Sequence, residues 1–186
     1  METKKIIGLG IIAIMILSTV ALVMVDFAVG PSSTFKYNGF KFRQMDGQLT
    51  AKIDGQQRVF LFFPGDLEYI RIPEDVKSML QKPVLTVTYD PNSTLSPNMA
   101  EAQYYLEVQL QDRKIIERAV TDNDGIELPQ KTCAEATEAQ PVVEFIESNT
   151  SVIKAVGNCI QVQALDAFDL YQQTERLVYS ILGVMP

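Results

Sequence analysis

The residues best suited to chemistry are three aspartates that follow two predicted strands. Asp90 comes directly after a strand over 84–89, and Asp122 and Asp124 follow a strand over 114–120. A helical pattern separates the two strands, and a strand-helix-strand order usually gives parallel pairing. We therefore expect the three carboxylates at one edge of a sheet, where ligands commonly bind. Oxygen ligands of this type suit Mg²⁺ or Ca²⁺, so the sequence predicts a candidate divalent-metal site.

The same aspartates also fit a purely structural role. Asp90 precedes Pro91, and Asp124 lies between Asn123 and Gly125, all of which are residue types that form tight turns. The turn role is the main hypothesis for these positions. The metal site is the alternative.

Composition excludes several other kinds of chemistry. The chain contains no histidine, which removes the commonest general base and metal ligand, together with Ser-His-Asp and Cys-His nucleophile arrangements. The net charge is −7, and no stripe of aromatic and basic residues offsets it. A surface of that sign repels phosphate backbones, so we expect no nucleic-acid partner. We also expect no cofactor. Because these catalytic arrangements are excluded, a protein that is not an enzyme is favoured.

The cysteines and two glycosylation sequons indicate a compartment outside the cytoplasm. Cys133 and Cys159 are the only cysteines, and an isolated pair in such a compartment is most simply a disulfide. Closing that loop would stabilise the fold by about 3–4 kcal/mol. The alternative is a pair of buried free thiols. The sequons at Asn92 and Asn149 lie in turn-like stretches and are predicted acceptors for glycans.

The amino-terminal segment predicts a membrane anchor. Ile6 to Val25 contains no charged residue and is long enough, as a helix, to cross the hydrocarbon core of a bilayer. The run exceeds the apolar core of a signal peptide, so a retained helix is favoured over a cleaved signal. Lys4 and Lys5 precede the run and Asp26 follows it, which predicts a cytoplasmic amino terminus and an exterior body. The expected organisation is a cytoplasmic amino terminus (1–5), a transmembrane helix (6–25), a linker (26–34) and one extracytoplasmic domain (35–186).

The pattern after the linker predicts an α+β fold. The dipeptides Asn38-Gly39, Asp46-Gly47 and Asp54-Gly55 are hairpin turns between alternating stretches, and they predict an antiparallel β-meander that ends in a central strand over 59–63. A βαβ unit over 84–120 follows. The rest of the chain predicts a disulfide-pinned β-hairpin region, with strands over 142–147 and 152–156 around a turn. A C-terminal helix capped by Asp166 closes the fold.

Several short stretches are similar to a group of uncharacterised archaeal proteins that carry one amino-terminal membrane segment. The resemblance spans nearly the whole chain, and it implies an archaeal cell surface and paired cysteines, with no activity and no catalytic residue. The stretches are 36–42 (KYNGFKF), 88–93 (TYDPNS), 102–106 (AQYYL), 158–160 (NCI) and 179–183 (YSILG).

These observations predict a membrane-anchored extracytoplasmic domain that acts as a binding module or as a subunit of a cell-envelope complex. Its expected partners are the lipid bilayer, through residues 6–25, and a protein of the envelope. One alternative is a divalent-metal-dependent hydrolase that uses Asp90, Asp122 and Asp124. A second alternative is a pilin-like structural subunit, although Ile6 and Ile7 separate Lys5 from Gly8 where a pilin-type processing site would place the basic residues beside the glycine.

Overall fold

Three two-residue turns build the first sheet. In Asn38-Gly39, Asp46-Gly47 and Asp54-Gly55 both residues have positive φ, which Asn, Asp and Gly adopt more readily than other residues. Each turn joins neighbouring strands of an antiparallel meander in the order β1-β2-β3-β4. The strands are β1 (Ser33–Tyr37), β2 (Phe40–Met45), β3 (Gln48–Ile53) and β4 (Gln56–Phe60). The structure is a computed structural model, and it describes residues 33–186.

The second sheet has five strands in the order β6-β5-β7-β9-β8. β5, β6, β7 and β9 are parallel, and β8 forms an antiparallel hairpin with β9. The strands are β5 (Val84–Tyr89), β6 (Ile115–Arg118), β7 (Val142–Glu147), β8 (Val152–Val156) and β9 (Cys159–Ala164). The helical elements are η1 (Pro64–Leu67), α2 (Glu74–Leu80), α3 (Ser96–Leu110), η2 (Cys133–Glu135) and α4 (Ala167–Ile181).

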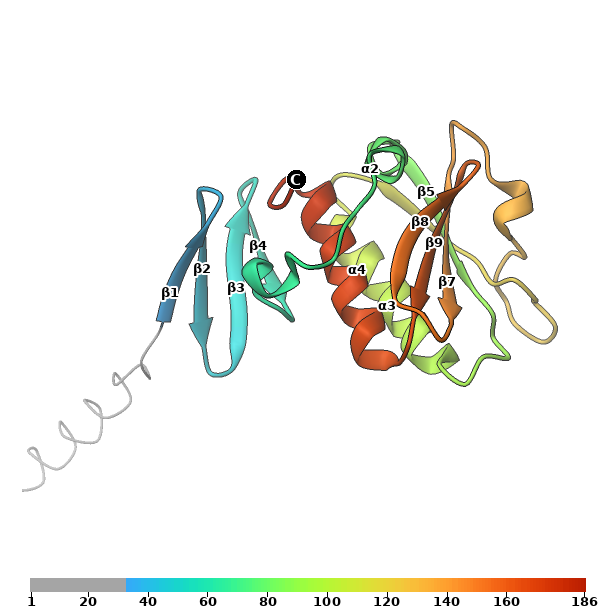
Figure 1. The fold of residues 1–186 in the computed structure, drawn as a ribbon, viewed down its shortest axis with the longest axis horizontal. Coiled ribbons are helices and arrows are strands. Elements are labelled where there is room, and N and C mark those ends of the chain that lie inside the picture. The colour runs from blue at the N-terminus through green and yellow to red at the C-terminus, as the bar shows by residue number, and fades with distance from the viewer. Residues whose placement is uncertain (1–32) are drawn as a thin grey trace, which may run out of the picture.

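Helix α4 lies between the two sheets, and the described chain therefore has three layers (Figure 1). The inner faces of the sheets supply buried residues such as Phe42 and Phe60 from the meander and Phe145 and Ile160 from the second sheet. Tyr179 of α4 contacts both Phe42 and Phe60 through its ring. Since both sides of α4 are covered, even its polar residues Gln173, Thr174, Glu175 and Arg176 are buried.

The opposite face of the second sheet is covered by the segment between β6 and β7. This segment includes η2, and it runs along the far side of the sheet from α4 (Figure 1). The Thr88 side chain donates a hydrogen bond to the carbonyl of Lys131 at 2.8 Å. A disulfide between Cys133 and Cys159 attaches the segment to the start of β9. The parallel strands are therefore buried on both faces, as strands of this kind usually are.

The predicted fold class needs one correction. It included a transmembrane helix, and within residues 33–186 no helix is both long enough and apolar enough to cross a bilayer. That helix was assigned to residues 6–25, which lie outside the described residues. Most of the predicted linker also lies outside them, and so does the amino-terminal apolar segment on which the pilin-like alternative depends. The α+β class, the antiparallel meander and the disulfide are confirmed.

Two predicted strand arrangements are also wrong. The apolar stretch 59–63 is not a central strand, because β4 is an edge strand that ends at Phe60. The chain then turns away from the sheet, and the ring of Phe62 packs against Phe168 of α4, while the ring of Phe63 packs against Phe42 on the inner face of the meander. The predicted strands 142–147 and 152–156 exist, but β7 pairs with β5 and β9, while β8 pairs only with β9.

Candidate functional site

A crevice of about 840 Å³ opens where the parallel strands of the second sheet end. From β5 the chain continues through α3 to β6 on one side, and from β7 it continues through β8 to β9 on the other side. The order of the strands therefore switches direction between β5 and β7. In open α/β sheets the crevice outside such a switch is the usual place for a ligand. The polar residues that line it include Asp90, Ser93, Glu144, Glu147, Asn149 and Gln161.

The turn between β5 and α3 forms one wall of the crevice and is held by Glu147. The side chain of Ser93 donates to Glu147 Oε2 at 2.6 Å, and the side chain of Thr94 donates to Oε1 at 2.6 Å. The backbone N–H of Thr94 donates to Oε2 at 3.0 Å. The hydrogen bonds from Ser93 and Thr94 lower the pKa of Glu147. A carboxylate with a lowered pKa is a weak base, so this arrangement fixes the turn and does not activate the Ser93 hydroxyl.

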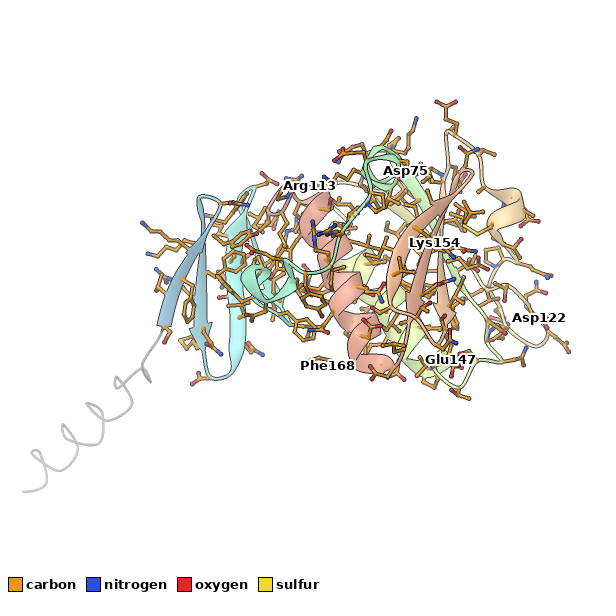
Figure 2. The ribbon with its side chains drawn as sticks, in the orientation of Figure 1. Asp75, Arg113, Asp122, Glu147, Lys154 and Phe168 are labelled. Atoms are coloured by element: carbon orange, nitrogen blue, oxygen red, sulfur yellow. A yellow bond between two sulfur atoms is a disulfide. The ribbon has the colours of Figure 1, made fainter. Side chains whose placement is uncertain are left out.

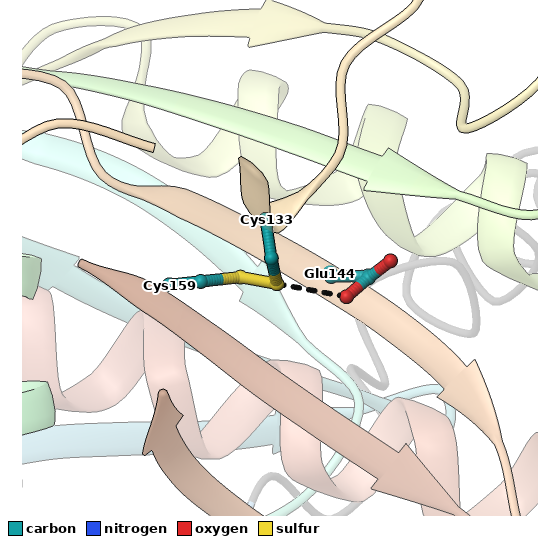
Figure 3. A group of neighbouring side chains, drawn as sticks. All are labelled: Cys133, Glu144 and Cys159. Atoms are coloured by element: carbon teal, nitrogen blue, oxygen red, sulfur yellow. Dashed lines mark hydrogen bonds between the residues drawn. A yellow bond between two sulfur atoms is a disulfide. The ribbon is translucent and has the colours of Figure 1, made fainter. Parts of the chain in front are cut away.

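Glu144 lies on the floor of the crevice and is half-buried. It stands opposite Gln161 in the β7–β9 register, on the sheet face that the disulfide segment covers. Glu144 Oε2 lies 2.8 Å from the Sγ atom of Cys133 (Figure 3). Gln161 Nε2 donates to the same oxygen at 3.4 Å. Burial raises the pKa of Glu144, against the lowering effect of the Gln161 hydrogen bond.

The contact between Glu144 and Cys133 is not a hydrogen bond donated by the sulfur. The Cys133 sulfur is bonded to Cys159 and carries no proton that it could donate. Donor atoms of Cys133, Glu144 and Cys159 lie within 4.8 Å of one another. With both sulfurs in a disulfide, however, the thiolate ligands that a metal site would need are not formed.

The structure does not bring the three predicted metal ligands together. Asp90 lines the crevice, but Asp122 and Asp124 do not. Among the described residues, these three carboxylates do not form a group whose oxygens all lie within 4.8 Å of one another. Figure 2 labels Asp122 on the segment after β6 and Glu147 near the end of β7.

Asp90 and Asp122 each accept a hydrogen bond from the backbone two residues further on, which explains why an aspartate stands at these turn positions. Asp90 Oδ1 accepts from the N–H of Asn92 at 2.8 Å, and Asp122 Oδ1 accepts from the N–H of Asp124 at 3.2 Å. These contacts are the local turns that Asp commonly forms with the backbone two residues on. They support the turn role, whereas metal binding remains a prediction.

The two predicted glycan acceptors are exposed and lie near the crevice. Asn149 lines it directly, and Asn92 lies between Asp90 and Ser93, which both line it. A glycan at Asn149 would therefore extend from the rim of the crevice. Glycosylation at both positions remains a prediction.

Sequence reasoning did not single out Glu144, Glu147 and Gln161. One signal was present, because Glu144 and Gln161 each lie between two buried apolar residues of their strands. A carboxylate in such a strand needs a partner or a ligand. The signal could not show that these residues are neighbours, because this depends on β7 and β9 pairing in parallel.

The electrostatics of the crevice favour positively charged ligands. Its lining contains the carboxylates of Asp90, Glu144 and Glu147 and no lysine or arginine. Hydroxyl and amide groups from Ser93, Asn149 and neighbouring residues supply further hydrogen-bonding partners. Negative charge on low-dielectric walls attracts cations and repels phosphates and carboxylates.

Comparison of the chain with protein-family models, with curated proteins and with solved structures finds no match in any of the three.

Proposed function

We propose that this protein is an extracytoplasmic binding module whose crevice receives a small organic cation. The observation that carries the proposal is the lining of the crevice at the β5–β7 switch, which contains three carboxylates and no basic side chain. The disulfide supports the location outside the cytoplasm, because such bonds persist mainly in oxidising compartments.

Glu144 is the residue that distinguishes ligands within the crevice. Its half-buried carboxyl group has a raised pKa, and an ammonium group beside it would stabilise the ionised form. A bound cation would thus replace the contact with the Cys133 sulfur by a charge-assisted hydrogen bond. Asp90 is exposed at the rim of the crevice, so it attracts the cation at long range and makes fewer direct contacts with it than Glu144 does.

Calorimetric titration of the full chain with spermidine at neutral pH tests the proposal. We expect saturable binding that weakens about tenfold in Glu144→Gln, because one charge-assisted hydrogen bond contributes about 1.4 kcal/mol or more. Glu127→Gln is a matched control, since Glu127 is exposed and does not line the crevice. Citrate is the matched anionic probe and should give no heat.

Three outcomes would contradict the proposal. The first is no binding of spermidine, and the second is equal affinity in the wild type and Glu144→Gln. The third is saturable binding of Mg²⁺, Ca²⁺ or Mn²⁺ that is lost in Asp122→Asn. That result would support the metal-dependent alternative instead.

A further inference from the structure

The charges of this protein are separated between its two sheets. Residues 33–60, which form the meander, contain five basic and two acidic side chains. Residues 61–186 contain nine basic and nineteen acidic side chains. The meander is therefore positively charged, although the whole chain carries a net charge of −7.

Four of the five basic side chains lie on the outer face of the meander. Strand residues alternate between the two faces, and the inner face carries buried residues such as Phe42 and Ala51. Lys36, Lys41, Arg43 and Lys52 fall on the opposite face and are exposed. The fifth, Arg58, is buried on the inner face. We call the exposed surface formed by Lys36, Lys41, Arg43 and Lys52 the basic face.

The basic face is not neutralised within the described part of the chain. None of the ion pairs formed by residues 33–186 includes Lys36, Lys41, Arg43 or Lys52. Lys36 stands directly opposite Lys41 in the β1–β2 register. Like charges in directly opposed positions destabilise a sheet, so an anionic partner would relieve this repulsion.

A shallow depression in the basic face has the donors that an anion needs. It has a volume of about 280 Å³ and is lined by Lys41, Arg43, Thr50, Lys52 and Gln57. These side chains offer ammonium, guanidinium, hydroxyl and amide donors, and the lining contains no carboxylate. Ammonium and guanidinium groups converging on one hollow are suited to phosphate oxygens.

Apolar side chains accompany the cations on the same surface. Met45 and Val59 belong to the outer face and are 49% and 45% exposed. Cations interleaved with exposed apolar groups are typical of surfaces that lie against a bilayer, where the apolar groups enter the headgroup region. A soluble anionic polymer would gain nothing from Met45 and Val59.

The position of the meander in the chain also favours a lipid partner. β1 begins eight residues after Val25, the last residue of the uncharged apolar run 6–25. Eight residues reach at most about 28 Å when fully extended. If the apolar run enters a lipid surface, the basic face therefore lies close enough to contact the same surface.

We propose that the basic face docks on a membrane surface that contains anionic phospholipids, with a headgroup phosphate in the depression between Lys41, Arg43 and Lys52. The crevice on the second sheet, which has α3 and α4 between it and the meander, then faces away from the bilayer. Docking and cation binding use different surfaces, so either can fail without the other.

The test measures the accessibility of individual lysines in the full chain. The protein is combined with vesicles of phosphatidylcholine alone or with vesicles that also contain phosphatidylglycerol. Lysine amines are then methylated with formaldehyde and dimethylamine–borane as the hydride donor. Both reagents are uncharged and therefore approach both kinds of vesicle equally. Each site is quantified by mass spectrometry. We expect labelling of Lys36, Lys41 and Lys52 to fall about fivefold with phosphatidylglycerol and to recover at high salt. Labelling of Lys131 and Lys154, which lie outside the meander, should not change.

Two matched charge-reversal variants and inorganic phosphate distinguish docking on lipid from binding of a free anion. Replacing Lys41, Arg43 and Lys52 together by Glu should make labelling of Lys36 independent of the lipid. Replacing Lys77, Lys131 and Lys154 by Glu should leave the lipid effect intact. Equal labelling of Lys41 and Lys52 with both kinds of vesicle would overturn the proposal. So would equal protection by inorganic phosphate with neutral vesicles, because the face would then bind a free anion.

Discussion

Glu175 shows how a single buried carboxyl group can couple the stability of this fold to pH. It lies on α4 and is fully buried between α3 and the end of the meander. The hydroxyl of Tyr105 donates to Glu175 Oε2 at 2.5 Å, and the N–H of Leu61 donates to Oε1 at 3.1 Å. Burial nevertheless outweighs these bonds and raises the pKa of Glu175 to about 7.

The sign of the pH effect follows from that shift. An unfolded Glu has a pKa of 4.5, so the folded state binds the proton more tightly than the unfolded state does. The contribution of Glu175 to stability is complete below about pH 4.5 and is lost as the pH rises through about 7. In Glu175→Gln this loss should disappear, because the amide keeps an acceptor oxygen and cannot ionise.

Urea denaturation of the wild type and Glu175→Gln across this pH range measures the difference. Relative to the variant, the wild type should lose on the order of 2–3 kcal/mol between mildly acidic and mildly alkaline pH. Glu127→Gln is the matched control and should follow the wild type, since Glu127 is exposed. Parallel curves for the wild type and Glu175→Gln would show that Glu175 does not titrate in this range.

At the scale of elements, Arg58 joins the edge strand of the meander to the end of α3. Its Nη2 atom donates to both carboxylate oxygens of Asp112 at 2.6 Å, and its Nη1 atom donates to the carbonyl of Gln109. The Gln109 side chain returns a hydrogen bond to the carbonyl of Val59 at 2.8 Å. A positive charge at the carboxyl end of a helix is also favourable to the helix dipole.

We expect Arg58→Met to lower the free energy of unfolding by about 2–4 kcal/mol. The variant leaves the carbonyl of the buried Gln109 without its donor and removes the ion pair with the exposed Asp112, and leaving a buried group unpaired costs more than the bond contributes. The double variant Arg58→Met with Asp112→Asn should be less destabilised than the two single changes added together. Chemical denaturation of the four proteins forms a double-mutant cycle, and strict additivity would show that the ion pair contributes nothing.

For the whole molecule, the central position of α4 makes the two sheets depend on each other. The inner face of the meander packs on α4 through Phe42, Phe60 and Tyr179, and the second sheet packs on the same helix through β9. A four-stranded meander without that helix would expose its apolar face to water.

Both sheets should therefore unfold in one cooperative step. Native-state amide exchange in increasing urea measures this, because amides of β3 and of β7 should converge on the same free energy of opening. Earlier opening of β3 alone would show that the meander is an independent unit. Arg58→Met is expected to move the protein in that direction, since it weakens the junction between the meander and α3.

Features that depend on neighbours along the chain were predictable from the pattern of residues alone. The three hairpin turns have the predicted positive φ angles, and the turn role of Asp90 and Asp122 agrees with their local hydrogen bonds. The positions of most strands and of the C-terminal helix were predictable for the same reason. Turn chemistry and hydrophobic period act over a few residues and are readable without a tertiary context.

Which of these elements are neighbours in space depends on the folded chain as a whole. Glu144, Glu147 and Ser93 meet because β7 lies beside β5, although about 50 residues of chain separate Ser93 from the two glutamates. Leu170, Leu177 and Ile181 are spaced to form one apolar stripe on α4, yet Glu175 on the other side is buried because the meander covers it. Parallel pairing and the packing of one layer on another join residues that are distant in the chain, and a local pattern does not encode such partners.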